Sequence, residues 1–177
     1  IGLGAIGKRV ARRCGAGFGM KVLGYDAYAG ALPDYIERVD GTERIFREAD
    51  FISLHLPSTP ETRHSIGKAQ FTMMKNSAIL INTSRGDVVC EDELIEALQR
   101  GEIGGAGLDV FSSEPISEAS YPLFDCKRVC LTPHNASFTV ESLYNAVKSV
   151  VQSVLEVAQG QKPTHAVNSP VHPRMEQ

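Results

Sequence analysis

The stretch "IGLGAIGKRV" (residues 1–10) contains three glycines, Gly2, Gly4 and Gly7, at the spacing G-x-G-x-x-G. This spacing is typical of a loop that cradles a dinucleotide pyrophosphate between a strand and the first turn of a helix. Gly2 would allow the tight turn, Gly4 the close approach of the pyrophosphate, and Gly7 the contact between helix and sheet. A chain with 16 glycines also produces such spacings by chance, and the motif then marks only a turn before a helix.

Two features of the following sequence support nucleotide binding. A helical pattern begins directly after the loop, which places backbone N–H groups and the positive end of the helix at the phosphate position. The stretch "KVLGYD" then predicts a strand ending in Asp26, about 20 residues beyond the loop, where a carboxylate accepts hydrogen bonds from the adenosine ribose. An acid there repels a 2′-phosphate, and no arginine follows in "AYAG". The sequence therefore predicts NAD rather than NADP.

Short apolar stretches alternate with helical patterns along the chain. Continuous apolar runs of this length suit strands buried on both faces of a parallel sheet; they occupy residues 20–26, 51–56, 78–83, 104–110 and 128–132. One helical pattern ends at Gly101, and the longest runs from about 141 to 159, with Thr139 as its N-cap and Gly160 as its end. Together these patterns predict an α/β fold, a Rossmann-type doubly wound parallel sheet with right-handed crossovers.

Composition limits the classes of partner. The chain has 177 residues, 42% hydrophobic and 22% charged, which suits one globular domain. Its net charge of −3 gives no electrostatic reason to expect nucleic acid or an anionic membrane, and no apolar run approaches the roughly 20 residues of a membrane span. The four cysteines form no C-x-x-C pair and have no zinc-type spacing to histidine. We expect no metal site, reduced thiols and a cytoplasmic location.

Four further stretches follow the glycine loop in a recognisable order: "LHLPSTPETR" (54–63), "LINTSRGDVV" (80–89), "GGAGLDVFSSEP" (104–115) and "LTPHNASFT" (131–139). With "GLGAIG" they resemble the D-isomer-specific 2-hydroxyacid dehydrogenases, over residues 1 to about 160. The resemblance implies an NAD-dependent oxidoreductase that interconverts a 2-keto acid and a D-2-hydroxy acid by hydride transfer. It also implies a homodimer, formed largely through the nucleotide-binding domain.

The resemblance assigns three catalytic residues, Arg85, Glu114 and His134. Arg85 would hold the substrate carboxylate and polarise the reacting carbonyl, since a guanidinium is always charged and grips two oxygens at once. His134 would donate and accept the proton, and Glu114 would fix its tautomer. Taken singly, each also suits an ordinary role, as a turn arginine, a solvated acid and a polar residue near a helix. All three follow predicted strands, where open α/β sheets bind ligands.

The resemblance also assigns cofactor contacts along the chain. They are Gly4, Ala5, Ile6 and Gly7 at the pyrophosphate, Asp26 at the ribose, Leu56, Pro57 and Thr62 near the adenosine, and Thr83, Ser84, Arg85, Asp109, His134 and Ala136 toward the nicotinamide. Asp109 would hydrogen-bond the nicotinamide amide, or cap the loop that follows it as a strand-end acid, and the two roles are compatible. The family is often glycine-rich after the histidine, whereas Asn135 and Ala136 stand here.

The expected domains are an NAD-binding domain over 1–160 and a C-terminal arm over 161–177. Family members carry a second, substrate-binding domain built mostly from the N-terminal part of the chain. That part and most of the first Rossmann strand are absent here, so we expect these residues to be a portion of a longer protein. The arm resembles the segment that returns to the missing domain, and we expect the fragment to bind NAD with little turnover.

Two alternatives remain open at this point. One is an NAD-sensing, corepressor-like interaction protein of the same family. The retained Arg85, Glu114 and His134 favour an enzyme over a sensor, because a sensor has no need of them. The other is a different Rossmann enzyme, such as a relative of adenosylhomocysteine hydrolase, which would not need these three residues to converge.

Overall fold

The computed structural model describes residues 1–116 and 121–166. It contains two compact units, Ile1–Ala136 and the residues from Ser137 onward. Its strands are β1 (Leu23–Gly24), β2 (Glu37–Arg38), β3 (Phe51–Leu54), β4 (Ile79–Asn82), β5 (Gly105–Leu108) and β6 (Val129–Leu131). Its α-helices are α1 (Ala5–Arg12), α2 (Glu43–Glu48), α3 (Lys68–Met73), α4 (Glu91–Arg100) and α5 (Val140–Ala158). The expected domain boundary at residue 160 stays a prediction, and residues 167–177 of the expected arm lie outside the described residues.

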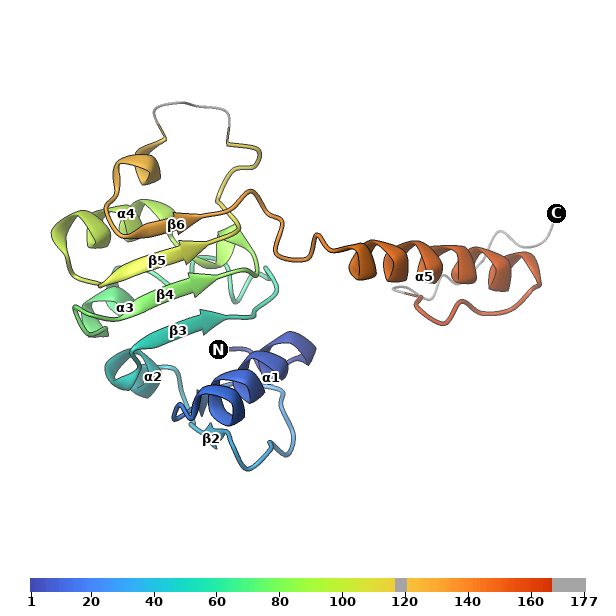
Figure 1. Ribbon diagram of the computed structural model, residues 1–177, viewed down its shortest axis with the longest axis horizontal. Coiled ribbons are helices and arrows are strands. Elements are labelled where there is room, and N and C mark those ends of the chain that lie inside the picture. The colour runs from blue at the N-terminus through green and yellow to red at the C-terminus, as the bar shows by residue number, and fades with distance from the viewer. Residues whose placement is uncertain (117–120, 167–177) are drawn as a thin grey trace. The chain divides into compact units, whose positions relative to one another are not determined.

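Four parallel strands form the main sheet of the first unit, in the order β3-β4-β5-β6 (Figure 1). Leu54, Asn82, Leu108 and Leu131 are register partners across the four strands, and each is the last residue of its strand. The loops that follow these residues therefore leave the sheet at one edge. The predicted parallel α/β sheet is confirmed, and this edge is where such sheets bind ligands.

Ile1 and Gly2 occupy the position of the first strand. The Ile1 amino group donates to the Ser53 carbonyl at 2.9 Å, and the His55 amide donates to the Ile1 carbonyl at 2.9 Å. On the other side, the Gly2 amide donates to the Tyr25 carbonyl at 2.8 Å. These two residues thus join the small parallel β1-β2 sheet to β3, and the chain order reverses between them. The glycine loop begins at this reversal, which is the usual nucleotide position in doubly wound sheets.

Helix α1 packs through its smallest side chains. Gly7 and Ala11 are its buried residues, whereas Ile6 is 67% exposed. A Cβ atom on Gly7 would lie 2.0 Å from the Gly2 carbonyl oxygen, so only glycine lets the helix approach the loop this closely. The predicted role of Gly7 in this contact agrees with the packing.

The predicted helix ends agree with the structure. Gly101 follows α4 with φ 67°, the left-handed conformation that glycine adopts without strain. In the second unit, Thr139 Oγ1 accepts a hydrogen bond from the Ser142 amide at 3.1 Å and caps α5, and Gly160 beyond its end has φ 74°.

The described part of the expected arm, residues 161–166, folds back on α5. The Thr164 amide and hydroxyl both donate to the Glu156 carboxylate, at 2.7 and 2.8 Å. The apolar side chains of α5 are exposed, among them Val147 and Val154 at 63% and 62%.

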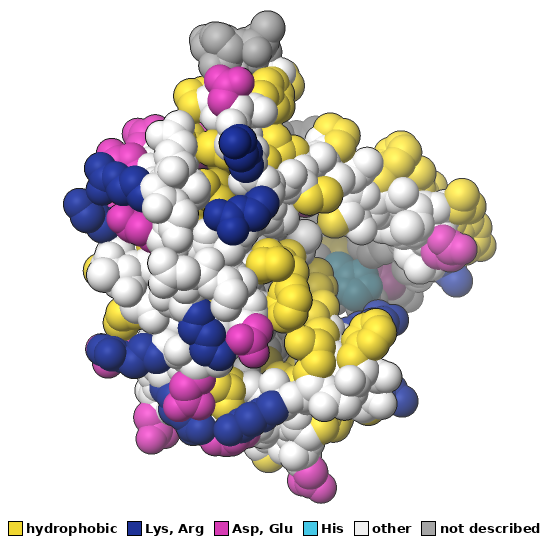
Figure 2. Space-filling view, turned by 60° about the vertical axis from the view of Figure 1, so that its left-hand side comes forward, with side chains coloured by type: hydrophobic (Ala, Val, Ile, Leu, Met, Phe, Trp, Pro, Cys, Tyr) yellow, Lys and Arg dark blue, Asp and Glu magenta, His cyan; other side chains and the backbone are white. Residues whose placement is uncertain are grey.

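The core of the first unit lies between the main sheet and its helices. Its largest fully buried apolar side chains are Phe46, Phe71, Ile52, Leu54, Leu80, Leu94, Ile103, Leu123 and Val88. All four cysteines are free; Cys126 is buried, whereas Cys130 is exposed. On the face shown in Figure 2, basic and acidic side chains are interspersed. Within the described residues, no helix combines the length and apolar character that crossing a bilayer requires.

Candidate active site

The glycine loop is held by Asp26, which follows β1. Asp26 Oδ2 accepts a hydrogen bond from the Leu3 amide at 2.7 Å, and Oδ1 accepts one from the Tyr28 amide at 2.8 Å. Gly2 has φ 85°, and a Cβ atom there would lie 2.5 Å from the His55 carbonyl oxygen. A Cβ atom on Gly4 would meet nothing within 4 Å. The start of α1 therefore faces open space, and the described helix has no acidic residue in its first turn, which suits an anion.

Asp26 retains acceptor capacity for a ligand. Its oxygens accept the Leu3 and Tyr28 amides, and a carboxylate offers about four lone-pair positions in all. Partial burial opposes ionisation, but the bonds from Leu3 and Tyr28 outweigh it and lower the Asp26 pKa. An ionised carboxylate beside the loop is the group expected to receive ribose hydroxyls.

The expected adenosine contacts lie beyond the carboxyl end of β3. Leu56 and Pro57 begin this loop, and Thr62 closes it. Thr62 Oγ1 donates to the Pro57 carbonyl at 2.6 Å and accepts from the Thr59 amide at 2.8 Å. The hydroxyl of Thr62 thus fixes the loop from within, and contact of these residues with adenosine stays a prediction.

The turn after β4 is organised by Asn82, which is 1% exposed. Its Nδ2 donates to the Arg85 carbonyl at 2.9 Å, and its Oδ1 accepts from the amide and hydroxyl of Ser84 at 3.0 and 2.8 Å. Asn82 therefore sets the backbone of Thr83, Ser84 and Arg85. Asn82 is not among the residues predicted from the sequence, although an asparagine at the end of an apolar run is a recognisable turn signal.

The turn after β6 is organised by Asp109, which is 3% exposed. Its Oδ1 accepts the Thr132 hydroxyl at 2.5 Å and the Asn135 amide at 2.9 Å, and its Oδ2 accepts the Ala136 amide at 2.9 Å. Inside this turn His134 has φ 51°, a conformation uncommon for residues other than glycine. Asp109 thus caps the turn after β6, whereas the sequence predicts that it caps the loop directly following it, and its contact with a nicotinamide stays a prediction.

Electrostatics keep the Asp109 carboxylate ionised. Burial alone would raise its pKa, but the hydrogen bonds from Thr132, Ala136 and Asn135 outweigh that cost and lower it. A negative charge therefore lies directly beneath the histidine turn.

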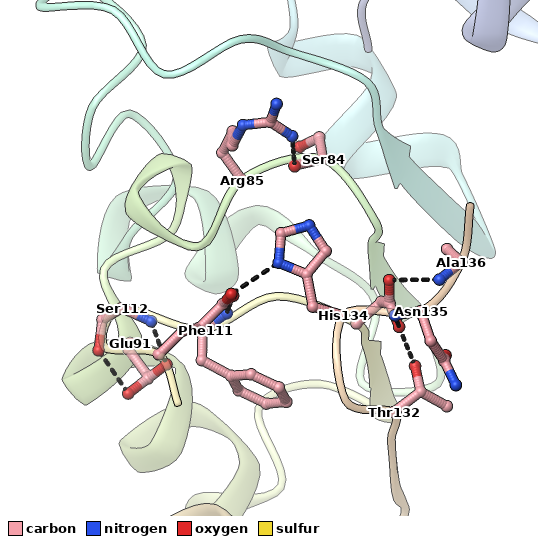
Figure 3. Close-up of polar contacts among 11 residues, drawn as sticks. Ser84, Arg85, Glu91, Phe111, Ser112, Thr132, His134, Asn135 and Ala136 are labelled. Atoms are coloured by element: carbon pink, nitrogen blue, oxygen red, sulfur yellow. Dashed lines mark hydrogen bonds and ion pairs between the residues drawn. The ribbon is translucent and has the colours of Figure 1, made fainter. Parts of the chain in front are cut away.

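Glu114 and His134 are in direct contact. His134 Nδ1 lies 2.6 Å from Glu114 Oε2, and the Phe111 amide donates to Glu114 Oε1 at 2.9 Å (Figure 3). Partial burial works against ionisation of Glu114, but the bonds from His134 and Phe111 prevail and lower its pKa. A carboxylate on Nδ1 fixes the histidine tautomer that leaves Nε2 to face a ligand.

Arg85 lies at the same sheet edge but does not touch this pair. It follows β4, whereas Glu114 and His134 follow β5 and β6, the next two strands of the sheet. Its Nη1 donates to the Ser84 carbonyl at 2.6 Å, and the side chain is exposed (Figure 3). The structure thus brings two of the three expected catalytic residues into contact and the third onto the neighbouring turn.

A parallel sheet with a glycine loop at its chain reversal and a histidine–carboxylate pair at its carboxyl edge defines a dinucleotide-binding domain of the dehydrogenase type. Residues 1–136 match the family model described as D-isomer specific 2-hydroxyacid dehydrogenase, NAD binding domain. The chain therefore belongs to the D-isomer specific 2-hydroxyacid dehydrogenase family.

Individual relatives match over nearly the whole chain. It is 42% identical to a glyoxylate reductase of Korarchaeum cryptofilum, covering 97% of this chain and 52% of that protein. It is 41% identical to a D-3-phosphoglycerate dehydrogenase of Methanocaldococcus jannaschii, covering 98% of this chain and 33% of that protein. The solved D-lactate dehydrogenase of Lactobacillus jensenii with NAD⁺ matches with a TM-score of 0.85 at 36% identity, over 95% of this chain and 54% of that one. The chain thus spans a third to about half the length of these relatives.

Proposed function

We propose that this chain is the NAD-binding part of an oxidoreductase that interconverts a 2-keto acid and a D-2-hydroxy acid. The observation that carries the proposal is the 2.6 Å contact between His134 Nδ1 and Glu114 Oε2 at the carboxyl edge of the sheet. This pair is suited to moving one proton, and the neighbouring turn supplies the cation of Arg85. The solved D-lactate dehydrogenase relative was determined with NAD⁺, which agrees with the same cofactor here.

The residues present fit a dinucleotide. The open space at Gly4 and the start of α1 would hold the pyrophosphate, and Asp26 would accept the hydroxyls of the adenosine ribose. Further contacts would come from Ala5, Ile6 and Gly7 in the loop, Leu56, Pro57 and Thr62 beyond β3, and Thr83, Ser84, Asp109 and Ala136 toward the nicotinamide. Bound NAD(H) supplies or accepts the hydride.

His134 supplies the proton that this chemistry needs. Reduction of a ketone creates negative charge on its oxygen, and Nε2 of His134 can donate a proton to that oxygen. In the reverse direction Nε2 takes the hydroxyl proton, and Glu114 stabilises the resulting imidazolium through Nδ1. Glu114 is ionised at neutral pH because its pKa is lowered, so it can play this part.

Arg85 would anchor the substrate carboxylate. Its guanidinium is exposed, and its contact with the Ser84 carbonyl is an exposed hydrogen bond of modest net strength. A carboxylate offers two oxygens and a negative charge, so it would replace the carbonyl as the guanidinium's partner. The same exposure leaves room for a 2-keto acid between Arg85 and His134.

Cofactor binding is tested by titration calorimetry of the chain with NADH and with NADPH. We expect NADH to bind, and NADPH to bind roughly tenfold or more weakly, because Asp26 repels a 2′-phosphate. Absence of NADH binding would overturn this half of the proposal. Equal binding of the two would leave an oxidoreductase but overturn the preference for NAD.

Turnover is tested by following NADH oxidation with a panel of 2-keto acids, both for the chain and for any longer polypeptide that contains it. Because the chain spans about half the length of the glyoxylate reductase it resembles, we expect it to turn over slowly by itself. In an active form, His134→Gln should lower kcat by roughly 10²- to 10⁴-fold, while His165→Gln, in the second unit, should not. Activity that survives His134→Gln would contradict the assignment.

The resemblance also implies a homodimer, which stays a prediction. A cytoplasmic location is proposed with it, supported by the four free cysteines, since a reducing compartment keeps thiols unpaired.

A further inference from the structure

Glu91 makes a two-point contact that the catalytic scheme does not use. It is the first residue of α4, and its carboxylate accepts the Ser112 amide on Oε2 at 3.0 Å and the Ser112 hydroxyl on Oε1 at 2.8 Å. Both oxygens are thus directed at one residue, which lies 21 positions further along the chain. Hydrogen bonds that a carboxylate accepts are charge-assisted, and they are shorter and stronger than those between neutral groups.

Ser112 belongs to the segment that presents Glu114. The amide of its neighbour Phe111 donates to Glu114 Oε1, while Glu114 Oε2 contacts His134 (Figure 3). One oxygen of Glu114 is held by the Phe111 amide, and this orients the other oxygen toward His134. The backbone at Phe111–Ser112 therefore determines where Glu114 is held.

The same segment is fixed against the turn of Arg85. A Cβ atom on Gly86 would lie 1.8 Å from the Phe111 carbonyl oxygen, so the two backbones are in close contact. The Phe111 ring packs edge-on against Tyr121, with ring centroids 6.1 Å apart. Burial, and after it the neighbouring Glu91 carboxylate, raise the pKa of the Tyr121 hydroxyl. Glu91 is half-buried, and the segment that it contacts packs against the Arg85 turn and Tyr121.

We propose that Glu91 is a positioning residue that, by fixing Ser112, holds Glu114 in contact with His134. The role in catalysis rests on the function proposed above, whereas the positioning itself does not. Glu91 touches neither the histidine nor the expected substrate position, so it acts only through the backbone of the 111–114 segment. Replacing Glu91 keeps the Glu114 carboxylate in the chain, but it removes the contact that fixes the segment presenting Glu114.

The direct test is the tautomer of His134, read from its Nδ1 and Nε2 nitrogen chemical shifts in the ¹⁵N-labelled chain under alkaline conditions, where imidazole is neutral. With Glu114 in place we expect the proton on Nδ1. Glu114→Gln should move it toward Nε2, and Glu91→Ala should produce part of the same change. Glu96→Ala is the matched control, because Glu96 lies on the exposed side of the same helix and pairs with Arg100. That variant should leave the tautomer unchanged.

A second variant guards against a simple folding defect. Ser112→Ala removes the hydroxyl donor and keeps the amide, so it should shift the tautomer in the same direction by a smaller amount. A tautomer that responds to Glu114→Gln but to neither Glu91→Ala nor Ser112→Ala would overturn the proposal. If Glu91→Ala does not fold, Ser112→Ala alone decides in the same way.

A kinetic measurement separates this inference from the proposed function. In an active form, Glu91→Ala should lower kcat roughly tenfold or more and leave the affinity for NADH within about twofold, because misplacement affects proton transfer and not the cofactor. Loss of NADH affinity together with kcat would indicate a general structural role and overturn the assignment. If no variant and no wild-type form reduces a keto acid, the proposed function fails, and the tautomer measurement still decides the role of Glu91.

Discussion

The glycine loop and the histidine turn hold their backbones in the same way and differ in what they present. The backbone of each is hydrogen-bonded to an aspartate that follows a strand. Asp26 accepts the Leu3 and Tyr28 amides, and Asp109 accepts the Asn135 and Ala136 amides. The loop at Gly2 reaches φ 85° with a glycine, whereas the histidine turn places His134 itself at φ 51°. In the proposed cofactor site the glycine loop would present only backbone N–H groups, so glycine suffices there. The proposed catalytic role of the histidine turn needs a side chain, and the Asp109 carboxylate holds that turn in the less favourable conformation.

The largest effect is expected from a substitution in the glycine loop. Gly7→Ala places a Cβ atom 2.0 Å from the Gly2 carbonyl oxygen, which forces the backbone of the loop or the helix to move. We expect a loss of about 3 kcal/mol or more in the free energy of unfolding, measured by urea denaturation, and loss of NADH binding. Gly4→Ala is the matched control, since its Cβ would meet nothing within 4 Å, and should cost less than about 1 kcal/mol. Equal losses in the two variants would show that close packing is not the reason for glycine at position 7.

The next effect compares the two aspartates directly. Asparagine keeps one acceptor oxygen but replaces the other with an NH₂ group, which cannot accept an N–H bond. Asp109→Asn should cost about 2 kcal/mol, because Asp109 is 3% exposed and three donors converge on it. Asp26→Asn should cost about half as much, since Asp26 is partly exposed and water can meet the orphaned amide. Urea denaturation of both variants checks the order, and a larger loss for Asp26→Asn would contradict it.

The smallest effect is a loss of stability in mild acid caused by His55. Burial lowers the pKa of His55, which lies beside the glycine loop, from 6.5 to about 4. Between these values the unfolded chain binds a proton that the folded chain does not, so the free energy of unfolding falls as the pH drops from about 6.5 to 4. Because His55 is partly exposed, we expect a change of only about 1 kcal/mol. Urea denaturation at several pH values measures this change, and His55→Gln should abolish it. A pH dependence of stability that persists in that variant would show that another group causes it.

The histidine turn should respond in a more acidic range. Glu114 and Asp109 have pKa values below their ordinary ones, so their contribution to stability is present above the ordinary carboxyl range and is lost as the pH falls through the lowered values. Mild acid should therefore destabilise the surroundings of the glycine loop before those of the histidine turn.

The elements that the sequence predicted well are those determined by their own residues. Apolar runs such as 51–56 and 78–83 become β3 and β4, and Gly101 ends α4, because burial on two faces and a left-handed C-cap leave a local signature. Strand β2 went unpredicted, since Glu37 and Arg38 are exposed and form no apolar run. Helices α2 and α3, with six residues each, are too short to establish a helical period.

The residues of the candidate site also divide into those that the sequence predicted and those that it did not. Motifs placed Arg85, Glu114 and His134 on neighbouring loops, and the contact between Glu114 and His134 is present in the structure. The supporting contacts of Asp109 and Glu91 reach partners more than 20 residues away, so spacing along the chain carries no sign of them. Cofactor contacts depend on a ligand as well as on the chain, and they stay predictions.

The pair Ile1 and Gly2 has one more consequence, for the way the domain opens. These two residues make backbone hydrogen bonds both to β3 and to the segment after β1. They therefore form a seam, the hydrogen-bonded connection between two sheets that are otherwise separate. Asp26 lies on one side of this seam, and the turns that carry Arg85 and His134 lie on the other. If these hydrogen bonds persist, the side of Asp26 and the side of Arg85 and His134 unfold as one cooperative unit, and the Gly2 and His55 amides exchange with solvent at the same slow rate. If these hydrogen bonds break before the rest of the domain unfolds, the protein opens locally between the two sheets, where the two halves of a dinucleotide would lie.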